Sequence, residues 1–215
     1  MKRVLQSWLA RASIAATLGV AGAAFAAASA PPALAPPAWP ANVGAAVTAP
    51  TDPVRPLLLG KLRVVLESTD LSTLRSAIGA GVVHQGAGSD TLSFLCYTIP
   101  DPVTPQRVWF TSSEAARKNA IDGIVAAEIA SGAPAEPQCP ELAAKFQPLR
   151  FDDGLWLGAL SAEQKRAFAP AIQKGTPWNS SFHEKRGNLD VIGSMAIDIR
   201  KGRAVGIYVL HATQN

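Results

Sequence analysis

The chain contains two cysteines, Cys96 and Cys139, and their thiols are its most reactive side chains. Neither belongs to a CxxC pair, and neither has a histidine or lysine beside it in the sequence that would lower the pKa of the thiol. The N-terminal residues, described below, indicate export to an oxidising compartment, where cysteines pair. The sequence therefore predicts a structural disulfide between Cys96 and Cys139 rather than a reactive thiol.

Histidines are the candidates for metal binding or acid–base chemistry. His84, His183 and His211 lie far apart in the sequence, and none has the spacing of an HExxH zinc motif. The sequence also lacks the GxSxG and SxxK nucleophile motifs and the phosphate-binding loop. We therefore expect no metal and no cofactor. A small exported hydrolase that uses His183 or His211, with a partner brought close by the fold, stays open as an alternative.

Aromatic and acidic strand residues are the candidates for binding another protein. Alternation along a strand places Val108 and Phe110 toward the core and Trp109 on the opposite face. We expect this opposite, outer face to combine aromatic and acidic side chains, as protein-binding surfaces do. The alternative is an ordinary solvated sheet face. The residues expected on the outer face are Tyr97, Trp109, Asp122, Glu128, Asp198 and Tyr208, of which Trp109, Tyr97, Tyr208 and Asp198 are the predicted binding residues.

Two short helices are predicted from their end signals. The first covers 69–78, with Thr69 as its N-cap and Gly79 as its stop. The second covers 161–169, where Ser161 and Gln164 have the spacing of a capping box and Pro170 is the expected end. Each helix follows a short apolar segment, over 62–67 and 154–158 respectively.

Runs of strands follow each helix, and they determine the predicted fold class. Lys201 and Gly202 predict a tight hairpin turn between the last two strands. Single helices between runs of strands predict an α+β protein with an antiparallel sheet covered by helices on one face. The helix-then-three-strands order occurs over 62–132 and again over 149–215, so a tandem duplication is one interpretation, and the ordinary recurrence of such elements in α+β proteins is the other. The predicted strands cover 91–99, 107–112, 121–130, 178–184, 194–200 and 204–212.

This doubled plan, with an LG-x-x-S-type entry to the helix, resembles the β-lactamase-inhibitor-protein-like fold, which is shared with the small lipoprotein of the outer-membrane β-barrel assembly complex. The residues that carry the resemblance are Leu157, Gly158, Ser161 and the hairpin over 195–211. The resemblance implies an exported binding module whose sheet face or loops hold another protein. The first half has Glu67 and Ser68 where the LG pair would stand, and the lipoprotein's anchoring cysteine is missing, so neither β-lactamase binding nor membership of the assembly complex is implied.

The N-terminus indicates export. Residues 1–30 combine Lys2 and Arg3 with an apolar stretch and then small residues, as a cleaved signal peptide does, and the apolar run is too short for a membrane anchor. Residues 31–56 are rich in proline and alanine and predict an extended linker. The remaining residues, 57–215, are expected to form one domain. The sequence thus predicts a periplasmic or secreted protein with no integral membrane segment after cleavage.

The net charge of the chain argues against one class of partner, nucleic acid. The formal net charge is +4, but Lys2, Arg3 and Arg11 lie in the predicted signal peptide, so the remaining chain is close to neutral. A nearly neutral chain lacks the positive field that attracts phosphate backbones, which argues against a nucleic-acid partner. The leading hypothesis is therefore a non-enzymatic protein-binding module with an envelope or extracellular protein as partner. A small hydrolase and a structural envelope protein are the alternatives.

Overall fold

The computed structural model describes residues 34–43, 46–85, 92–114, 116, 119–133 and 136–215. The expected signal peptide over 1–30 lies outside these residues. The described residues all belong to one compact unit, which extends from Ala33 to Asn215. Within this part of the chain, no helix has both the length and the apolar character needed to cross a membrane.

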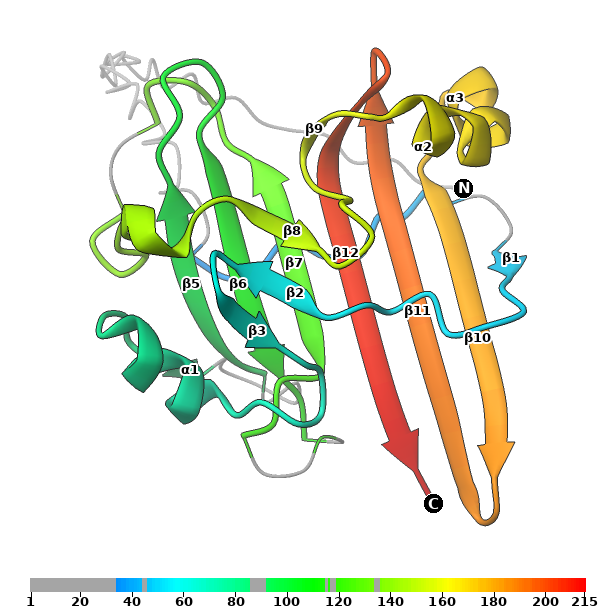
Figure 1. Cartoon of the computed structure of the whole chain (residues 1–215), viewed down its shortest axis with the longest axis horizontal. Helices are drawn as coiled ribbons and strands as arrows, with labels where there is room; N and C mark the ends of the chain where they lie inside the picture. Colours follow the sequence, from blue (N-terminus) through cyan, green and yellow to red (C-terminus); the bar gives the residue numbers. More distant parts are fainter. Residues whose placement is uncertain (1–33, 44–45, 86–91, 115, 117–118, 134–135) are drawn as a thin grey trace, which may run out of the picture. The chain divides into compact units, whose positions relative to one another are not determined.

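A large sheet holds most of the longer strands, in the order β1-β10-β11-β12-β7-β6-β5-β4, with β9 also paired to β12 (Figure 1). Neighbouring strands pair antiparallel except β1 and β10, which are parallel. The antiparallel sheet is thus confirmed. Its strands are β1 (Val47–Thr48), β4 (His84–Gln85), β5 (Ser93–Ile99), β6 (Gln106–Ser112), β7 (Gly123–Glu128), β9 (Gly158–Ala159), β10 (Trp178–Arg186), β11 (Leu189–Arg200) and β12 (Arg203–Gln214).

A second, three-stranded sheet was not predicted from the sequence. Its order is β3-β2-β8, formed by β2 (Leu57–Leu59), β3 (Leu62–Val64) and β8 (Leu149–Phe151). In Figure 1 it lies across one face of the large sheet together with α1 (Leu71–Ile78). Buried residues of both sheets and of α1 form one hydrophobic cluster, so this face of the large sheet is the core face.

The helix ends differ in part from the prediction. Helix α1 has Asp70 rather than Thr69 at its N-cap, because the Thr69 hydroxyl accepts a hydrogen bond from the Val65 amide instead. The capping box between Ser161 and Gln164 is confirmed at the start of α2 (Ala162–Ala167). Pro170 does not end the helix there. It lies in the first turn of α3 (Ala169–Lys174), where a helix needs no proline N–H.

The C-terminal hairpin forms as predicted. Arg200 of β11 pairs with Arg203 of β12, and both turn residues have positive φ, 51° at Lys201 and 72° at Gly202. Met195 and Ile197 of β11 belong to the core cluster, and Ala196 between them is buried as well. A short 3₁₀ helix, η1 (Ala144–Phe146), precedes β8.

The structure describes residues 34–43 and 46–56 of the predicted linker over 31–56, and these residues contact the domain at several points. We call this segment the N-terminal arm. Leu34 accepts a hydrogen bond from the Trp109 indole, Val47 and Thr48 pair with β10, and the Asp52 carboxylate contacts the His211 ring. Proline-rich composition therefore does not keep this segment away from the domain, because its few apolar and acidic side chains find partners there.

Candidate functional site

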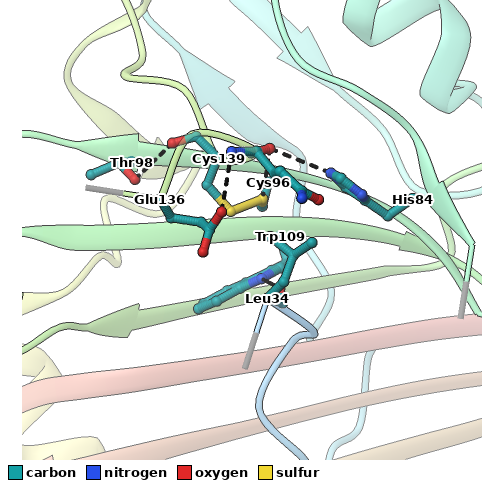
Figure 2. The surroundings of a disulfide bond; sticks show 8 residues. Leu34, His84, Cys96, Thr98, Trp109, Glu136 and Cys139 are labelled. Atoms are coloured by element: carbon teal, nitrogen blue, oxygen red, sulfur yellow. Dashed lines mark hydrogen bonds between the residues drawn. A yellow bond between two sulfur atoms is a disulfide. The ribbon is translucent and has the colours of Figure 1, made fainter. Parts of the chain in front are cut away.

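The disulfide between Cys96 and Cys139 is present, and the prediction is confirmed. Both residues are buried, at 1% and 2% exposure. Cys139 lies in the loop after β7, and this loop is attached to β5 by hydrogen bonds as well. The Thr98 hydroxyl donates to the Cys139 carbonyl at 3.0 Å, and the Thr98 amide donates to the Pro140 carbonyl at 3.0 Å (Figure 2). The disulfide therefore fastens this loop against the edge of the sheet.

Two of the four predicted binding residues are buried. Tyr97 pairs with Val108 in the ladder, so it shares the core face of Val108 and is fully buried; its expected place on the outer face is wrong. Trp109 does lie on the outer face, but it is 3% exposed, and its indole N–H donates to the Leu34 carbonyl at 2.9 Å. Figure 2 shows Trp109 between the disulfide and the N-terminal arm. Among the described residues, Trp109 is thus covered by the chain itself.

Tyr208 and Asp198 are the two predicted binding residues that the structure brings together on the accessible outer face. Burial raises the pKa of the Tyr208 hydroxyl, and the nearby Asp198 carboxylate raises it further. Asp198 also pairs with Arg200 at 2.8 Å, and the Tyr208 ring lies 6.0 Å from the ring of Trp39 in the N-terminal arm. The accessible outer face therefore carries the ring of Tyr208 and the carboxylate of Asp198, and this carboxylate is paired with Arg200.

The two histidines of the hydrolase alternative lie on different faces of the sheet. His183 pairs with Asp190 at 2.9 Å on an exposed part of β10. The ring of His211 lies between two carboxylates, with Nε2 3.0 Å from Asp52 and Nδ1 2.8 Å from Glu67. Its carboxylate partners come from the N-terminal arm and from the turn before α1, so this contact joins distant segments of the chain.

Asp122, also expected on the outer face, does not contribute to an accessible surface, since it is 2% exposed. One carboxylate oxygen accepts hydrogen bonds from the amide and hydroxyl of Ser113, whereas the other has no partner among the described residues. Burial raises the pKa of Asp122 above its ordinary value, and the Ser113 hydrogen bonds oppose this shift. Glu128, the remaining expected outer-face acid, pairs with Arg203 at 3.1 Å.

Asp122→Asn should alter the pH dependence of stability. Above the ordinary pKa of 3.8 and below the raised value, the native protein keeps a proton that the unfolded chain has released, so this residue's contribution to stability falls as pH rises. Urea unfolding should therefore show that the free energy of unfolding of the wild type falls, relative to that of the Asn variant, between pH values below 3.8 and neutral pH. Asp101→Asn is the control. Two backbone amides lower the pKa of Asp101, so its contribution to stability should rise with pH instead of falling. Parallel pH curves for wild type and the Asp122 variant would contradict the prediction.

A pocket of about 550 Å³ lies beside the disulfide, and we call it the proline pocket. It is formed where β5 ends, where β6 begins and where the loop after β7 is fastened back by the disulfide. Prolines have a fixed φ, so its walls are stiff and little backbone entropy is lost when they bind something. Its size falls within the range typical of ligand sites. Its lining includes Thr98, Pro100, Pro102, Pro105, Ile129, Ala133, Pro137, Cys139 and Pro140, together with Arg107, Asp101, Glu136 and Glu141.

Arg107 is the buried charge of the proline pocket. It is 4% exposed, and its Nε has no hydrogen-bond partner among the described residues. Its guanidinium carbon lies 5.9 Å from the centre of the Trp109 ring. Burial lowers the pKa of Arg107, and the Glu136 carboxylate opposes this shift. A charged group so far out of water normally has a hydrogen-bonded partner of opposite charge, and among the described residues the Glu136 carboxylate stabilises Arg107 only through the electrostatic effect on its pKa.

No local signal in the sequence points to this pocket. Arg107 lies two residues before Trp109 on β6, but its burial depends on the loop around Cys139, which is distant in sequence. The one signal that pointed here was the disulfide, together with a concentration of prolines over 100–105 and 137–140.

Comparisons of the chain with protein-family models, with curated proteins and with solved structures found no match. The resemblance to the β-lactamase-inhibitor-protein-like fold therefore stays a prediction.

Proposed function

We propose that this chain is an exported, non-enzymatic binding protein, and that it holds a segment of another polypeptide in the proline pocket. Export is supported by the N-terminal sequence and is consistent with the disulfide. The single observation that carries the binding role is the preformed pocket with Arg107 buried in its wall and not fully hydrogen-bonded. The partner is an envelope or extracellular protein, because those are the proteins that an exported chain meets.

The outer face contributes less to this proposal than the sequence indicated. Tyr97 belongs to the core, and Trp109 is covered by the N-terminal arm. Tyr208 and Asp198 remain on the accessible surface and form a secondary contact region in the proposal. Hot spots lie in well-packed pockets, and the proline pocket offers a concave site that a sheet surface lacks.

The tandem duplication is part of the proposal. The strands β7 and β12, which end the two helix-then-strands units, pair antiparallel at the middle of the large sheet, with Val125 opposite Tyr208. Outward from this pair, the orders β6-β5 and β11-β10 follow in mirror sequence. Such an arrangement is what a duplicated unit related by an approximate two-fold axis would give.

The binding role is tested with a pool of random N-acetylated hexapeptides, added to the isotope-labelled chain with its disulfide formed. Backbone amide signals of Thr98 and Ile129 in the pocket should shift, while those of Leu189 on the far hairpin should not. Ala133→Trp would fill the pocket and should weaken binding at least about tenfold, equivalent to about 1.4 kcal/mol. Ala143→Trp, on an exposed residue outside the pocket, is the matched control and should bind like wild type.

Two results would overturn the proposal. One is the absence of pocket shifts at millimolar peptide, and the other is equal binding by the Ala133 variant. Mass analysis of the same peptide pool after incubation distinguishes the hydrolase alternative. Peptide cleavage that His183→Ala or His211→Ala abolishes, with thermal stability kept, would replace the binding role with a catalytic one.

A further inference from the structure

We infer that the proline pocket recognises the free C-terminus of a polypeptide, with the terminal carboxylate placed against Arg107. The inference rests on the proposed binding function and names the part of the partner that the pocket takes. It follows from three features of the pocket: a buried guanidinium, stiff apolar walls and acidic groups at the mouth.

The guanidinium selects an anion. Arg107 is almost completely buried, and its Nε lacks a hydrogen-bond partner among the described residues, although the arginine lines the pocket. A carboxylate matches the planar fork of an arginine with two parallel hydrogen bonds. The Glu136 carboxylate stabilises this charge only in part, so a carboxylate in the pocket would add a favourable charge beside the guanidinium, whereas an uncharged amide would not.

The walls and the mouth of the pocket limit which residues can precede the terminal carboxylate. Ile129, Ala133 and the prolines offer apolar contact to the last side chains of a peptide. The carboxylates of Asp101, Glu136 and Glu141 also line the pocket, and both Asp101 and Glu141 are exposed. Arg203 lies close enough to lower the pKa of Asp101, but its guanidinium pairs with Glu128.

This charge pattern disfavours a simple anion. A small anion would have to pass the exposed carboxylates to reach the guanidinium, with no group of its own to balance them. A peptide end with one carboxylate and a basic side chain a few residues earlier fits both charges at once. The structure thus favours C-termini that combine apolar and basic residues.

The test uses two versions of one N-acetylated hexapeptide pool, the first with free C-terminal carboxylates and the second with C-terminal amides. The free-acid pool should shift the pocket amides of Thr98 and Ile129, and the amide pool should bind about tenfold to a hundredfold more weakly, as expected for a lost charge-assisted hydrogen bond. A free-acid pool without lysine and arginine should also bind more weakly, and the difference should shrink at high salt.

Arg107→Gln should remove the preference for the free acid, while Arg150→Gln, an exposed arginine on β8, should keep it. If the Arg107 variant does not fold, the comparison of the two pools on wild type decides by itself. Equal binding of acid and amide pools would overturn the C-terminal inference and leave the proposed binding function intact. Binding of neither pool would overturn both.

Discussion

Replacing both cysteines, as C96A/C139A, should lower the free energy of unfolding by about 3 to 4 kcal/mol. The two residues are 43 apart in sequence, and a cross-link over that separation removes many conformations from the unfolded chain. Both sulfurs are buried, so the variant also loses packing against Phe94 and Trp109. Chemical denaturation of the variant and of the wild type in the same buffer measures the difference.

The reduced wild type is the matched control for the double variant. It has the same sequence as the oxidised protein, and it should unfold at a denaturant concentration close to that of C96A/C139A. Equal midpoints for the oxidised and reduced wild type would show that the cross-link contributes nothing. Loss of the cross-link should also affect binding, because Cys139 lines the proline pocket. The reduced chain should therefore bind the free-acid peptide pool more weakly than the oxidised chain does.

The parts of the fold that were predictable have local signals. The Lys201-Gly202 turn and the Ser161 capping box are each specified by a few neighbouring residues, and both form as expected. The small sheet was missed because β2 and β8 are three residues long, too short to show alternation, and they pair across a long sequence separation. Long-range pairing of short strands has no signature in a single sequence.

The candidate site was less predictable for the same reason. Tyr97 lies on the core face because it pairs with Val108 in the β5–β6 ladder. The register of that ladder could not be derived from the sequence of either strand alone. The burial of Trp109 depends on Leu34, 75 residues away, and the burial of Arg107 depends on the loop of Cys139. The sequence identified the disulfide that builds the pocket, but not the arginine inside it.

Tyr97→Ala should be among the most destabilising single substitutions, at about 3 to 5 kcal/mol, because it empties a large volume in the core. Tyr97 is fully buried, and its ring meets that of Phe110 edge to face at 6.3 Å. Tyr97→Phe keeps the ring and loses the hydroxyl, which donates to the Ala80 carbonyl at 2.9 Å, so it should cost about 1 kcal/mol. Thermal and urea unfolding of the two variants separate packing from hydrogen bonding. If Tyr97→Ala matched wild type in stability, the residue would belong on the surface after all.

The same hydroxyl should make the protein sensitive to alkali. Burial raises the pKa of Tyr97 from 10.0 to about 12, so the native state keeps its proton while the unfolded chain loses it. Its contribution to stability is therefore complete below pH 10 and is lost as the pH rises to about 12. Tyr97→Phe has no such proton and should lose less stability over that interval than wild type does. The same alkaline loss in both proteins would assign it to other groups, of which Tyr208, whose pKa is also raised, is the first to examine by Tyr208→Phe.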